Sequence, residues 1–203
     1  MKPLSSLCLW ALLPVMLVAQ AQYAFEGEEL NFTLLQSASS DSLIWNVCGD
    51  FYMSNLHNEA LSRMIVFPVP STLDIGVAEN ITLDLIEPSD SMAVELIGQG
   101  ASGFSFRLDL PSRSFAKLRI SYNQRIGGNT AHYVLLTANS WGRPLPFCDM
   151  TLILGHGIEL EELPFPSPSL SDCEFGKVFH WQYLDFRPDK DFIVKIRQHT
   201  HVF

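Results

Sequence analysis

The chain has 203 residues, of which 47% are hydrophobic and 17% charged, which suits one globular domain with an additional segment better than two complete domains. Its formal net charge is −9, from 13 basic and 22 acidic residues. This balance argues against nucleic acid as a partner, because affinity for phosphates depends on clustered lysine and arginine.

Residues 1–21 have the features of a secretory signal peptide. Lys2 supplies a positive charge, Leu7 to Val18 form an apolar run interrupted by Pro14, and Ala19-Gln20-Ala21 has the small-x-small pattern of a cleavage site. This apolar run is too short to span a bilayer, and no later segment has about 18 uninterrupted apolar residues. We therefore expect a secreted, extracellular protein without a membrane span.

Residues 22–68 give mixed signals and are predicted to form an N-terminal extension of uncertain fold. Residues 29–36 and 42–53 have the composition of short strands, whereas residues 55–64 resemble one or two helical turns. The Phe-Pro-Val-Pro segment at 67–70 is a natural boundary, because proline removes a ladder donor and biases its predecessor toward extended backbone.

Residues 69–203 have the pattern of an all-β domain. Apolar and polar residues alternate in several short segments, at intervals of roughly ten residues and with turn residues between them. This spacing favours an antiparallel two-sheet sandwich. The predicted strands lie at 80–88, 103–111, 117–126, 131–142, 150–155, 177–186 and 191–199, and residues 160–172, with three prolines, are predicted to form a surface excursion.

The cysteines and the sequons are compatible with an extracellular compartment. Outside the predicted signal peptide an odd number of cysteines remains, and the pairing that fits the sequence most simply joins Cys148 to Cys173. Cys48 would then be free, buried or bonded to another chain, but sequence alone does not choose among the three possible pairs. Asn31 and Asn80 begin N-x-Thr sequons and are candidate glycosylation sites.

Motifs for catalysis, cofactors and metals are largely absent from the sequence. It contains no Cys-x-x-Cys, no phosphate-binding glycine-rich motif before a helix and no Gly-x-Ser-x-Gly elbow. His199-x-His201 near the chain end is more simply incidental than a metal site. Glu161 and Glu162 belong to an acidic run of the kind that is usually solvated. We expect a non-enzymatic protein without cofactor or metal.

The polar face of the predicted strand 117–126 raises the question of a ligand. Ser121, Asn123 and Arg125 share this face, because alternate residues of a strand point the same way. If the following strand is its antiparallel neighbour, Asn139 and Trp141 would join them. A guanidinium, two carboxamides and an indole suit a sugar, since they match vicinal hydroxyls and the apolar C–H face of a pyranose. The simpler interpretation is a solvated outer face.

These residues carry a resemblance to the galectins, which are β-galactoside-binding lectins. The galectin signature runs His-x-Asn-x-Arg, Val-x-Asn and Trp-Gly-x-Glu-x-Arg; "SYNQR" resembles the first element, "TAN" the second and "WGRPLP" the third. The resemblance covers roughly residues 69–203 at low identity. It implies a jelly-roll-like sandwich in which Asn123, Arg125, Asn139 and Trp141 bind a glycan.

The sequence also departs from the galectin pattern. Ser121 replaces the histidine, and Pro144 and Pro146 replace the glutamate and arginine of the third element. Each change removes a hydrogen bond to sugar, worth about 1–3 kcal/mol when a buried partner is left unpaired. The chain also stops at Phe203, where the family continues for two more strands, so either the N-terminal extension completes the sheets or the chain is an incomplete version of the fold.

The leading hypothesis is a secreted, non-catalytic carbohydrate-binding module for β-galactosides or a related glycan. The alternative is a galectin fold that has lost sugar binding and acts as an extracellular interaction or structural protein, with oligomers formed through Cys48. A third hypothesis, an extracellular glycan hydrolase, rests on scattered carboxylates and histidines, with Glu161 and Glu162 as its best candidates. The identity of the sugar, the oligomeric state and the role of residues 22–68 are not determined by the sequence.

Overall fold

The computed structural model describes residues 23–38, 42–86, 88–89 and 91–197. The predicted signal peptide and the His199-x-His201 pair lie outside these residues. Within them the chain forms thirteen strands and one short 3-10 helix, η1. Their bounds are β1 Tyr23–Gln36, β2 Leu43–Asn55, β3 Leu61–Pro68, β4 Glu79–Ile86, β5 Ala93–Gly100, β6 Gly103–Leu110, β7 Phe115–Ile126, β8 Thr130–Tyr133, η1 Leu136–Trp141, β9 Leu145–Gly155, β10 Leu160–Glu162, β11 Ser169–Cys173, β12 Gly176–Phe186 and β13 Phe192–Ile196.

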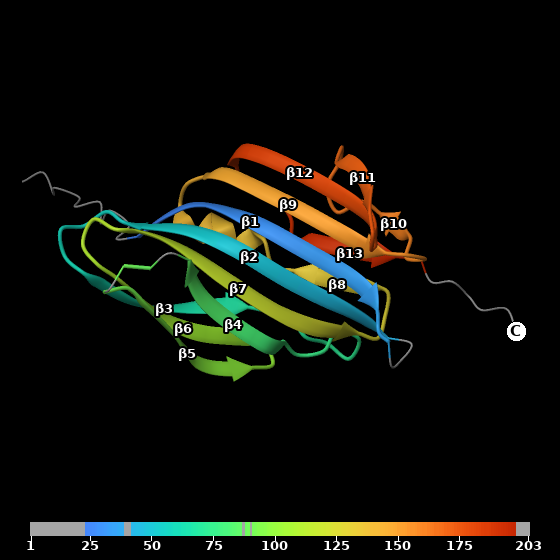
Figure 1. Ribbon diagram of the computed structural model, residues 1–203, viewed down its shortest axis with the longest axis horizontal. Helices are drawn as coiled ribbons and strands as arrows, with labels where there is room; N and C mark the ends of the chain where they lie inside the picture. The colour runs from blue at the N-terminus through green and yellow to red at the C-terminus, as the bar shows by residue number, and fades with distance from the viewer. Residues whose placement is uncertain (1–22, 39–41, 87, 90, 198–203) are drawn as a thin grey trace, which may run out of the picture.

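A seven-stranded sheet forms the larger layer of the fold, in the order β11-β12-β9-β1-β2-β7-β4 (Figure 1). Its neighbouring strands are antiparallel except for β1 and β9, which run parallel. The sheet is therefore mixed. Strands from the beginning, middle and end of the chain are interleaved in it.

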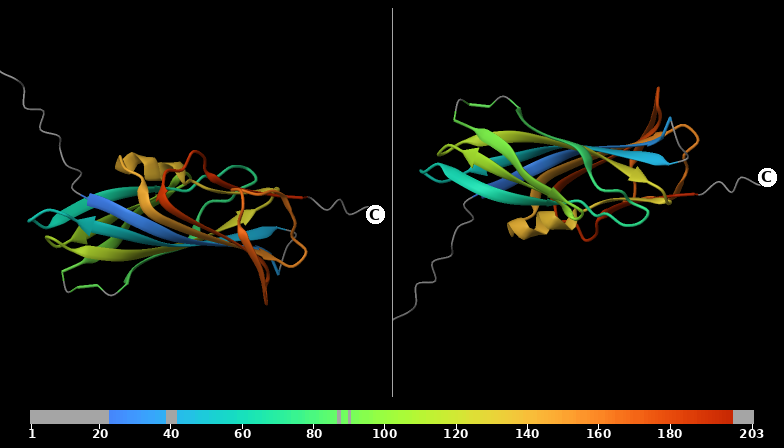
Figure 2. Two further views of the ribbon diagram at one scale, coloured as in Figure 1. Left: turned by 90° about the horizontal axis from the view of Figure 1, so that it is seen from above. Right: turned by 90° about the horizontal axis from the view of Figure 1, so that it is seen from below.

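Two three-stranded sheets, β3-β6-β5 and β8-β13-β10, cover one face of the large sheet (Figures 1 and 2). Phe32 and Tyr122 lie on the same face, because each is the cross-strand partner of Val47. The Phe32 ring packs against Phe192 of β13, and the Tyr122 ring packs against Phe104 of β6. The covered face is called the inner face below, and the opposite one the outer face.

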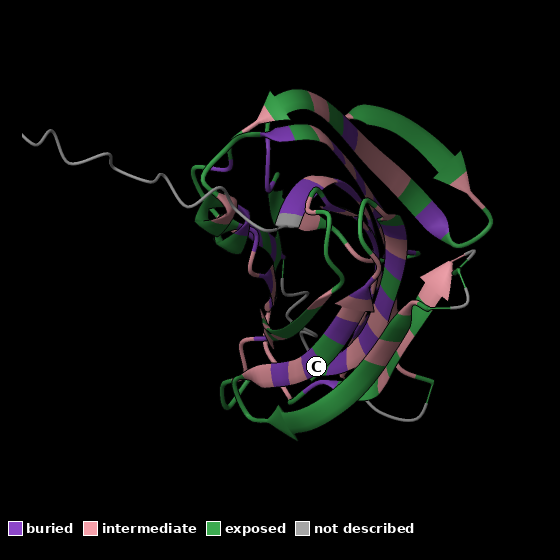
Figure 3. Ribbon diagram, turned by 90° about the vertical axis from the view of Figure 1, so that its left-hand side faces the viewer, coloured by how far each residue is buried: buried purple, intermediate pink, exposed green. Residues whose placement is uncertain are grey.

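Alternation along the central strands explains why they form this layer. In β7 the residues at even positions, from Ala116 to Ile126, are buried, whereas those at odd positions are exposed or half-buried. In β2 burial follows the odd positions from Leu43 to Asn55. A period of two places one apolar set on the inner face, where it leaves water. Figure 3 shows this alternation as stripes along the strands of the curved sheet.

Aromatic rings hold the three sheets together in the core. The Phe32 ring lies between Trp45 at 5.1 Å and Phe192 at 4.4 Å, both stacked, with Tyr133 edge-on at 5.2 Å. Phe67 joins β3 to β6 and β7 through its contacts with Phe104 and Tyr122. Because such pairs bury large apolar areas, they fix how the small sheets sit on the large one.

The all-β, sandwich-like architecture predicted from the sequence is confirmed. The division after residue 68 does not separate two structural units, since β1 and β2 occupy the centre of the large sheet and β3 pairs with β6. The helical turns expected at 55–64 are also absent there. Instead, the Asn55 side chain donates to the carbonyls of Glu59 and Pro111 at 2.8 and 2.6 Å, and strand β3 follows.

An ion-pair network on the outer face ties three adjacent strands together. Asp50 of β2 accepts two hydrogen bonds from Arg119, at 2.6 and 2.8 Å, and its carboxylate lies 2.9 Å from the Lys117 ammonium. Lys117 in turn lies 3.5 Å from Glu29 of β1. These cations and their hydrogen bonds lower the pKa of Asp50 below its usual value.

No helix in the described part of the chain has the length and apolar character needed to cross a membrane.

We predict that Phe32→Ala lowers the free energy of unfolding by about 3–5 kcal/mol, because it opens a cavity among the stacked rings. The measurement is equilibrium unfolding in urea. Phe175→Ala is the matched control, since the Phe175 side chain is 57% exposed, and its expected effect is within about 0.5 kcal/mol. Equal effects of the two substitutions would contradict the assignment of Phe32 to the core.

We predict that Asp50→Asn lowers the free energy of unfolding by about 1–3 kcal/mol at pH 7, since it removes a carboxylate hydrogen-bonded to two cations. The pKa of Asp50 is lower in the folded than in the unfolded chain, so its stabilisation is present above the ordinary carboxyl pKa and is lost as the pH falls. The difference in unfolding free energy between the wild type and the variant should therefore become smaller as the pH is lowered. Urea titrations at several pH values measure it. A difference independent of pH would contradict this explanation.

Candidate functional site: an apolar groove with a buried carboxyl group

A groove of about 320 Å³ lies on the inner face of the large sheet. Its floor consists of inward residues of β1, β2 and β7, and it lies between the small sheet that contains β3 and the segment formed by β8 and η1. The lining side chains are mostly apolar or aromatic and include Phe25, Phe51, Phe67, Phe106, Tyr133 and Trp141.

One wall of the groove is the edge of strand β3. Five consecutive residues, Met64 to Pro68, line it. Successive side chains of a strand point to opposite faces, so a single face would contribute only alternate residues. The edge itself must therefore border the groove, in agreement with the terminal position of β3 in the order β3-β6-β5. The opposite wall carries the hydroxyl-bearing Thr137 and Ser140 of η1.

A β-bulge in β1 sets which residues of this strand reach the groove. Phe25 pairs with Met53 and Gly27 with Tyr52, so one extra residue is inserted between them. As a result, Phe25 and Glu28, which are three residues apart, both face inward and line the groove. Gly27 is required here, because a Cβ atom at this position would come within 2.5 Å of the Phe147 ring.

Glu28 is the acidic residue that lines the groove. Its cross-strand neighbours in the large sheet are apolar or only weakly polar. Its cross-strand partners are Phe51 of β2 and Cys148 of β9, and Phe51 is followed by Leu118 of β7. The Glu28 residue is only 3% exposed. The Cys148 thiol donates a hydrogen bond to its Oε1 at 3.5 Å, and a thiol is a weak donor. The carboxyl group is therefore buried with little compensation.

Burial raises the pKa of Glu28 to about 7, and the Cys148 hydrogen bond opposes this only in part. Burial also raises the pKa of the Cys148 thiol and of the Tyr133 phenol, and the nearby Glu28 charge adds to both shifts. Cys148 and Tyr133 consequently stay neutral near pH 7, where Glu28 changes between its neutral and charged forms. A carboxyl group with this property in an apolar groove is a candidate binding group.

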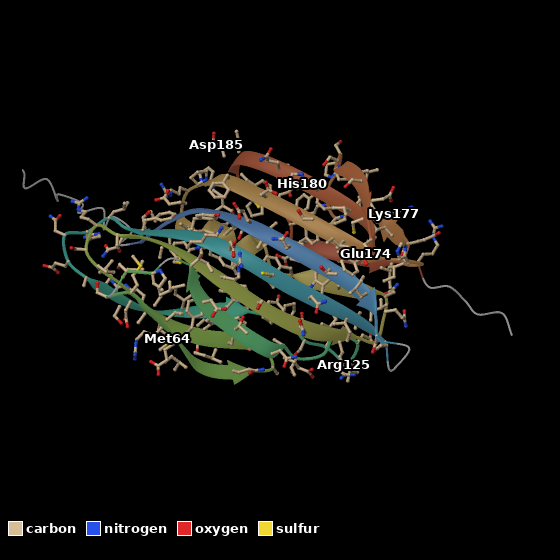
Figure 4. All side chains as sticks on the ribbon, in the orientation of Figure 1. Met64, Arg125, Glu174, Lys177, His180 and Asp185 are labelled. Carbon is tan, nitrogen blue, oxygen red and sulfur yellow. The ribbon has the colours of Figure 1, made fainter. Side chains whose placement is uncertain are left out.

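The outer face carries the residues that were predicted from the strand 117–126. Ser121, Asn123 and Arg125 occupy odd positions of β7, opposite to the buried set, and the Ser121 and Thr82 hydroxyls lie 2.6 Å apart. Arg125 is exposed near the end of β7 (Figure 4). These three residues therefore point away from the groove.

Asn139 and Trp141 belong to η1, behind the large sheet, and not to a strand beside β7. Strand β8 pairs with β13, so the antiparallel pairing of β7 with its successor does not form. Asn139 donates to the Pro188 carbonyl at 2.8 Å, and the Trp141 ring packs against Phe25 at 5.3 Å and lines the groove. The structure thus separates Asn123 and Arg125 from Asn139 and Trp141 instead of gathering them in one hollow.

The predicted Cys148–Cys173 disulfide is not present. Both cysteines are free, as is Cys48, which lies half-buried on β2. Cys173 pairs with Gly176, whose neighbour Gly155 is seven residues along β9 from Cys148. Seven residues of strand span about 23 Å, whereas a disulfide needs Cα atoms within about 7 Å. Cys148 is fully buried against Glu28.

The remaining candidates lie on the surface. Asn31 on β1 and Asn80 on β4 are exposed, as glycosylation requires, and so are Glu161 and Glu162. Glu162 lies 3.6 Å from the Lys195 ammonium. Among the described residues, no cluster of three or more histidine, cysteine or acidic side chains could hold a metal ion.

Comparisons with known proteins identify a shared fold and no family. No family model matches the chain, and neither does any curated protein. A solved structure described as a "putative nutrient binding protein" from Legionella pneumophila is similar over 88% of this chain and 68% of its own, with a TM-score of 0.65 and 14% identity. At this identity the likeness shows the fold alone.

Two further solved structures align less well. A "putative protease" from Parabacteroides distasonis is 10% identical over 86% of this chain and 40% of its own, with a TM-score of 0.41. Native yeast LTA4 hydrolase is 7% identical over 79% of this chain and 26% of its own, with a TM-score of 0.42. Both scores are too low to support an argument about this chain.

Sequence reasoning missed Glu28, although the sequence contains a signal for it. Leu30, Phe32 and Leu34 alternate, and the same parity continued backwards places Glu28 on the apolar face. An acidic residue at such a position is unusual, since charged groups are seldom buried without a partner. An acidic residue at an apolar position of the alternation is therefore the sequence signal for the candidate site.

We predict that Glu28→Gln becomes more stable than the wild type as the pH rises. The folded chain holds the Glu28 proton up to a pKa of about 7, while the unfolded chain releases it near 4.5, so the wild type loses stability through this window. The difference in unfolding free energy should grow by on the order of 3 kcal/mol between pH 4 and pH 8. Urea unfolding at several pH values measures it, and parallel profiles for the two proteins would refute a buried, titrating Glu28.

Proposed function

We propose that this protein is a non-enzymatic binding protein that holds a small, mainly apolar ligand in the groove between β3 and η1. The observation that carries the proposal is the groove itself, an apolar, aromatic-lined hollow with one buried carboxyl group at its floor. Concave, mostly apolar sites with a few polar groups are typical of small-molecule binding.

The dimensions of the groove limit the size of the ligand. Its volume of about 320 Å³ is at the lower end of the range of small-molecule sites. At about 30 Å³ for each water-sized group, it holds roughly ten non-hydrogen atoms. The hydroxyls of Thr137 and Ser140 on one wall donate to the carbonyls of Val134 and Thr137, so toward a ligand their oxygens can act as hydrogen-bond acceptors.

The proposal includes an extracellular location, which depends on the signal-peptide features of residues 1–21. The Legionella pneumophila structure shares the fold, and its printed description names nutrient binding in that protein. Because the two chains are 14% identical, the support for binding in this chain comes from the groove and not from that description.

Carbohydrate binding stays a hypothesis from the sequence, and the geometry favours the apolar groove over it. Asn123 and Arg125 point outward from β7, whereas Trp141 lines the groove on the inner face. A single hexose cannot contact both groups of residues through the large sheet. A glycan bound by Asn123 and Arg125 alone would lack the aromatic plane on which the galectin comparison depends.

We predict that 1-octanol binds in the groove and shifts the NMR signals of the methyl groups that line it. Met53 and Met64 are lining residues, whereas Met150 lies in the core outside the groove. In a protein labelled at methionine methyl groups, the signals of Met53 and Met64 should move saturably on titration, while that of Met150 stays fixed. The transfer of apolar surface from water provides the driving force.

A blocking variant and a matched control complete this experiment. Ser140→Trp places an indole at an exposed lining position of η1 and should weaken octanol binding at least tenfold. Leu136→Trp adds the same side chain to the same helix, at an exposed residue outside the lining, and should leave binding unchanged. Failure of octanol to move the lining signals, or equal binding by both variants, would overturn the proposed function.

A further inference from the structure

The Glu28 carboxyl group is the feature of the groove that a purely apolar ligand does not explain. It is 97% buried and lies on the groove lining, with Phe51 as its neighbour on one side and Cys148 on the other. The hydrogen bond from the Cys148 thiol, at 3.5 Å, leaves most of its hydrogen-bonding capacity unused. A buried acidic group that is poorly paired is costly, so a ligand that pairs with it gains affinity.

We infer that the groove selects small primary amines with an apolar body, whose ammonium group pairs with the Glu28 carboxylate. This inference rests on the proposed function and specifies its ligand class. The apolar chain would lie against the floor formed by β2 and β7, and the ammonium group would reach the row that contains Glu28.

Aromatic rings around the groove favour a cation over a neutral group. Phe25, Phe51 and Trp141 line it together, with 6.1 Å between the Phe25 and Phe51 ring centroids and 5.3 Å between those of Phe25 and Trp141. The negative faces of such rings attract ammonium groups, and more strongly where water is excluded. A carboxylate ligand would instead meet the Glu28 charge, and an alcohol would gain no charge pairing.

Charges near Glu28 do not compete with the ligand. The titratable groups close to it in the described structure are Cys148 of β9 and Tyr133 of β8, both with raised pKa values and therefore neutral at pH 7. The residues that face it from β2 and β7, Phe51 and Leu118, are apolar. Among the residues that the structure describes, no cation pairs with Glu28, so the amine would supply the missing positive charge.

Binding should therefore be linked to the protonation of Glu28. Because an ammonium group favours the charged form of the carboxyl group, it must displace the proton at a pH below the pKa of about 7. Affinity for the amine should fall toward tenfold for each pH unit below 7, and it should level off above pH 8 while the amine remains protonated. Octanol displaces no proton, so its affinity should not decrease in the same way.

The test compares n-octylamine, 1-octanol and octanoate by the methionine methyl titration at pH 8. We expect octylamine to bind at least tenfold more tightly than octanol, and octanoate more weakly than both. Glu28→Gln should remove the preference for the amine while octanol binding persists. Glu29→Gln is the matched control, since Glu29 is the next residue of β1 but points to the outer face, where it accepts from Tyr52 at 2.8 Å.

The outcomes separate this inference from the proposed function. Equal binding of amine and alcohol, or a preference that survives Glu28→Gln, overturns the amine inference and leaves apolar binding standing. A preference lost equally in Glu29→Gln would also overturn it, because it would reflect attraction to the acidic chain as a whole. Absence of binding by all three probes overturns the proposed function.

Discussion

The inner face of the seven-stranded sheet has to be covered, and two separate three-stranded sheets cover it. Each small sheet packs its own aromatic residues onto the large one, Phe67 and Phe104 on one side and Phe192 on the other. The small sheets share no strand pairing with each other. Where they fail to meet, the apolar floor of β1, β2 and β7 stays accessible, and the groove is the consequence of this division.

The groove and the stability of the fold make opposing demands on Glu28. A neutral or apolar residue would suit the inner face better, because a carboxyl group there loses its hydration without a strong partner. Alternation with Leu30 and Phe32 nevertheless turns Glu28 inward, and the bulge before it brings Phe25 to the same face. Local destabilisation of this kind is typical of binding sites, where a ligand supplies what the protein lacks.

On the outer face, by contrast, a buried carboxyl group is paired with cations. Asp50 is buried too, but two hydrogen bonds from Arg119 and a close Lys117 ammonium compensate it, and its pKa is lowered instead of raised. The two carboxyl groups lie on adjacent strands and differ in their partners more than in their burial. Protein cations compensate Asp50, whereas for Glu28 we propose that a ligand does so.

The sequence by itself determined the strand character of most of the chain, because alternation along β2, β6 and β7 decides which side chains leave water. It also indicated the outward direction of Ser121, Asn123 and Arg125, and continued alternation in β1 would have placed Glu28 inward. Local patterns of this kind depend on near neighbours along the chain, so they can be recognised without coordinates.

Only the tertiary structure decided which strands became neighbours. The pairing of β8 with β13 instead of β7 separated Asn139 and Trp141 from Arg125, and the interleaving of β1 and β2 with later strands removed the boundary expected after residue 68. The same long-range pairing placed Cys148 beside Glu28 and far from Cys173. Strand order depends on how whole faces of the sheets are covered. Alternation of apolar and polar residues shows which face of a strand is buried, but it does not show which other strand or sheet covers that face.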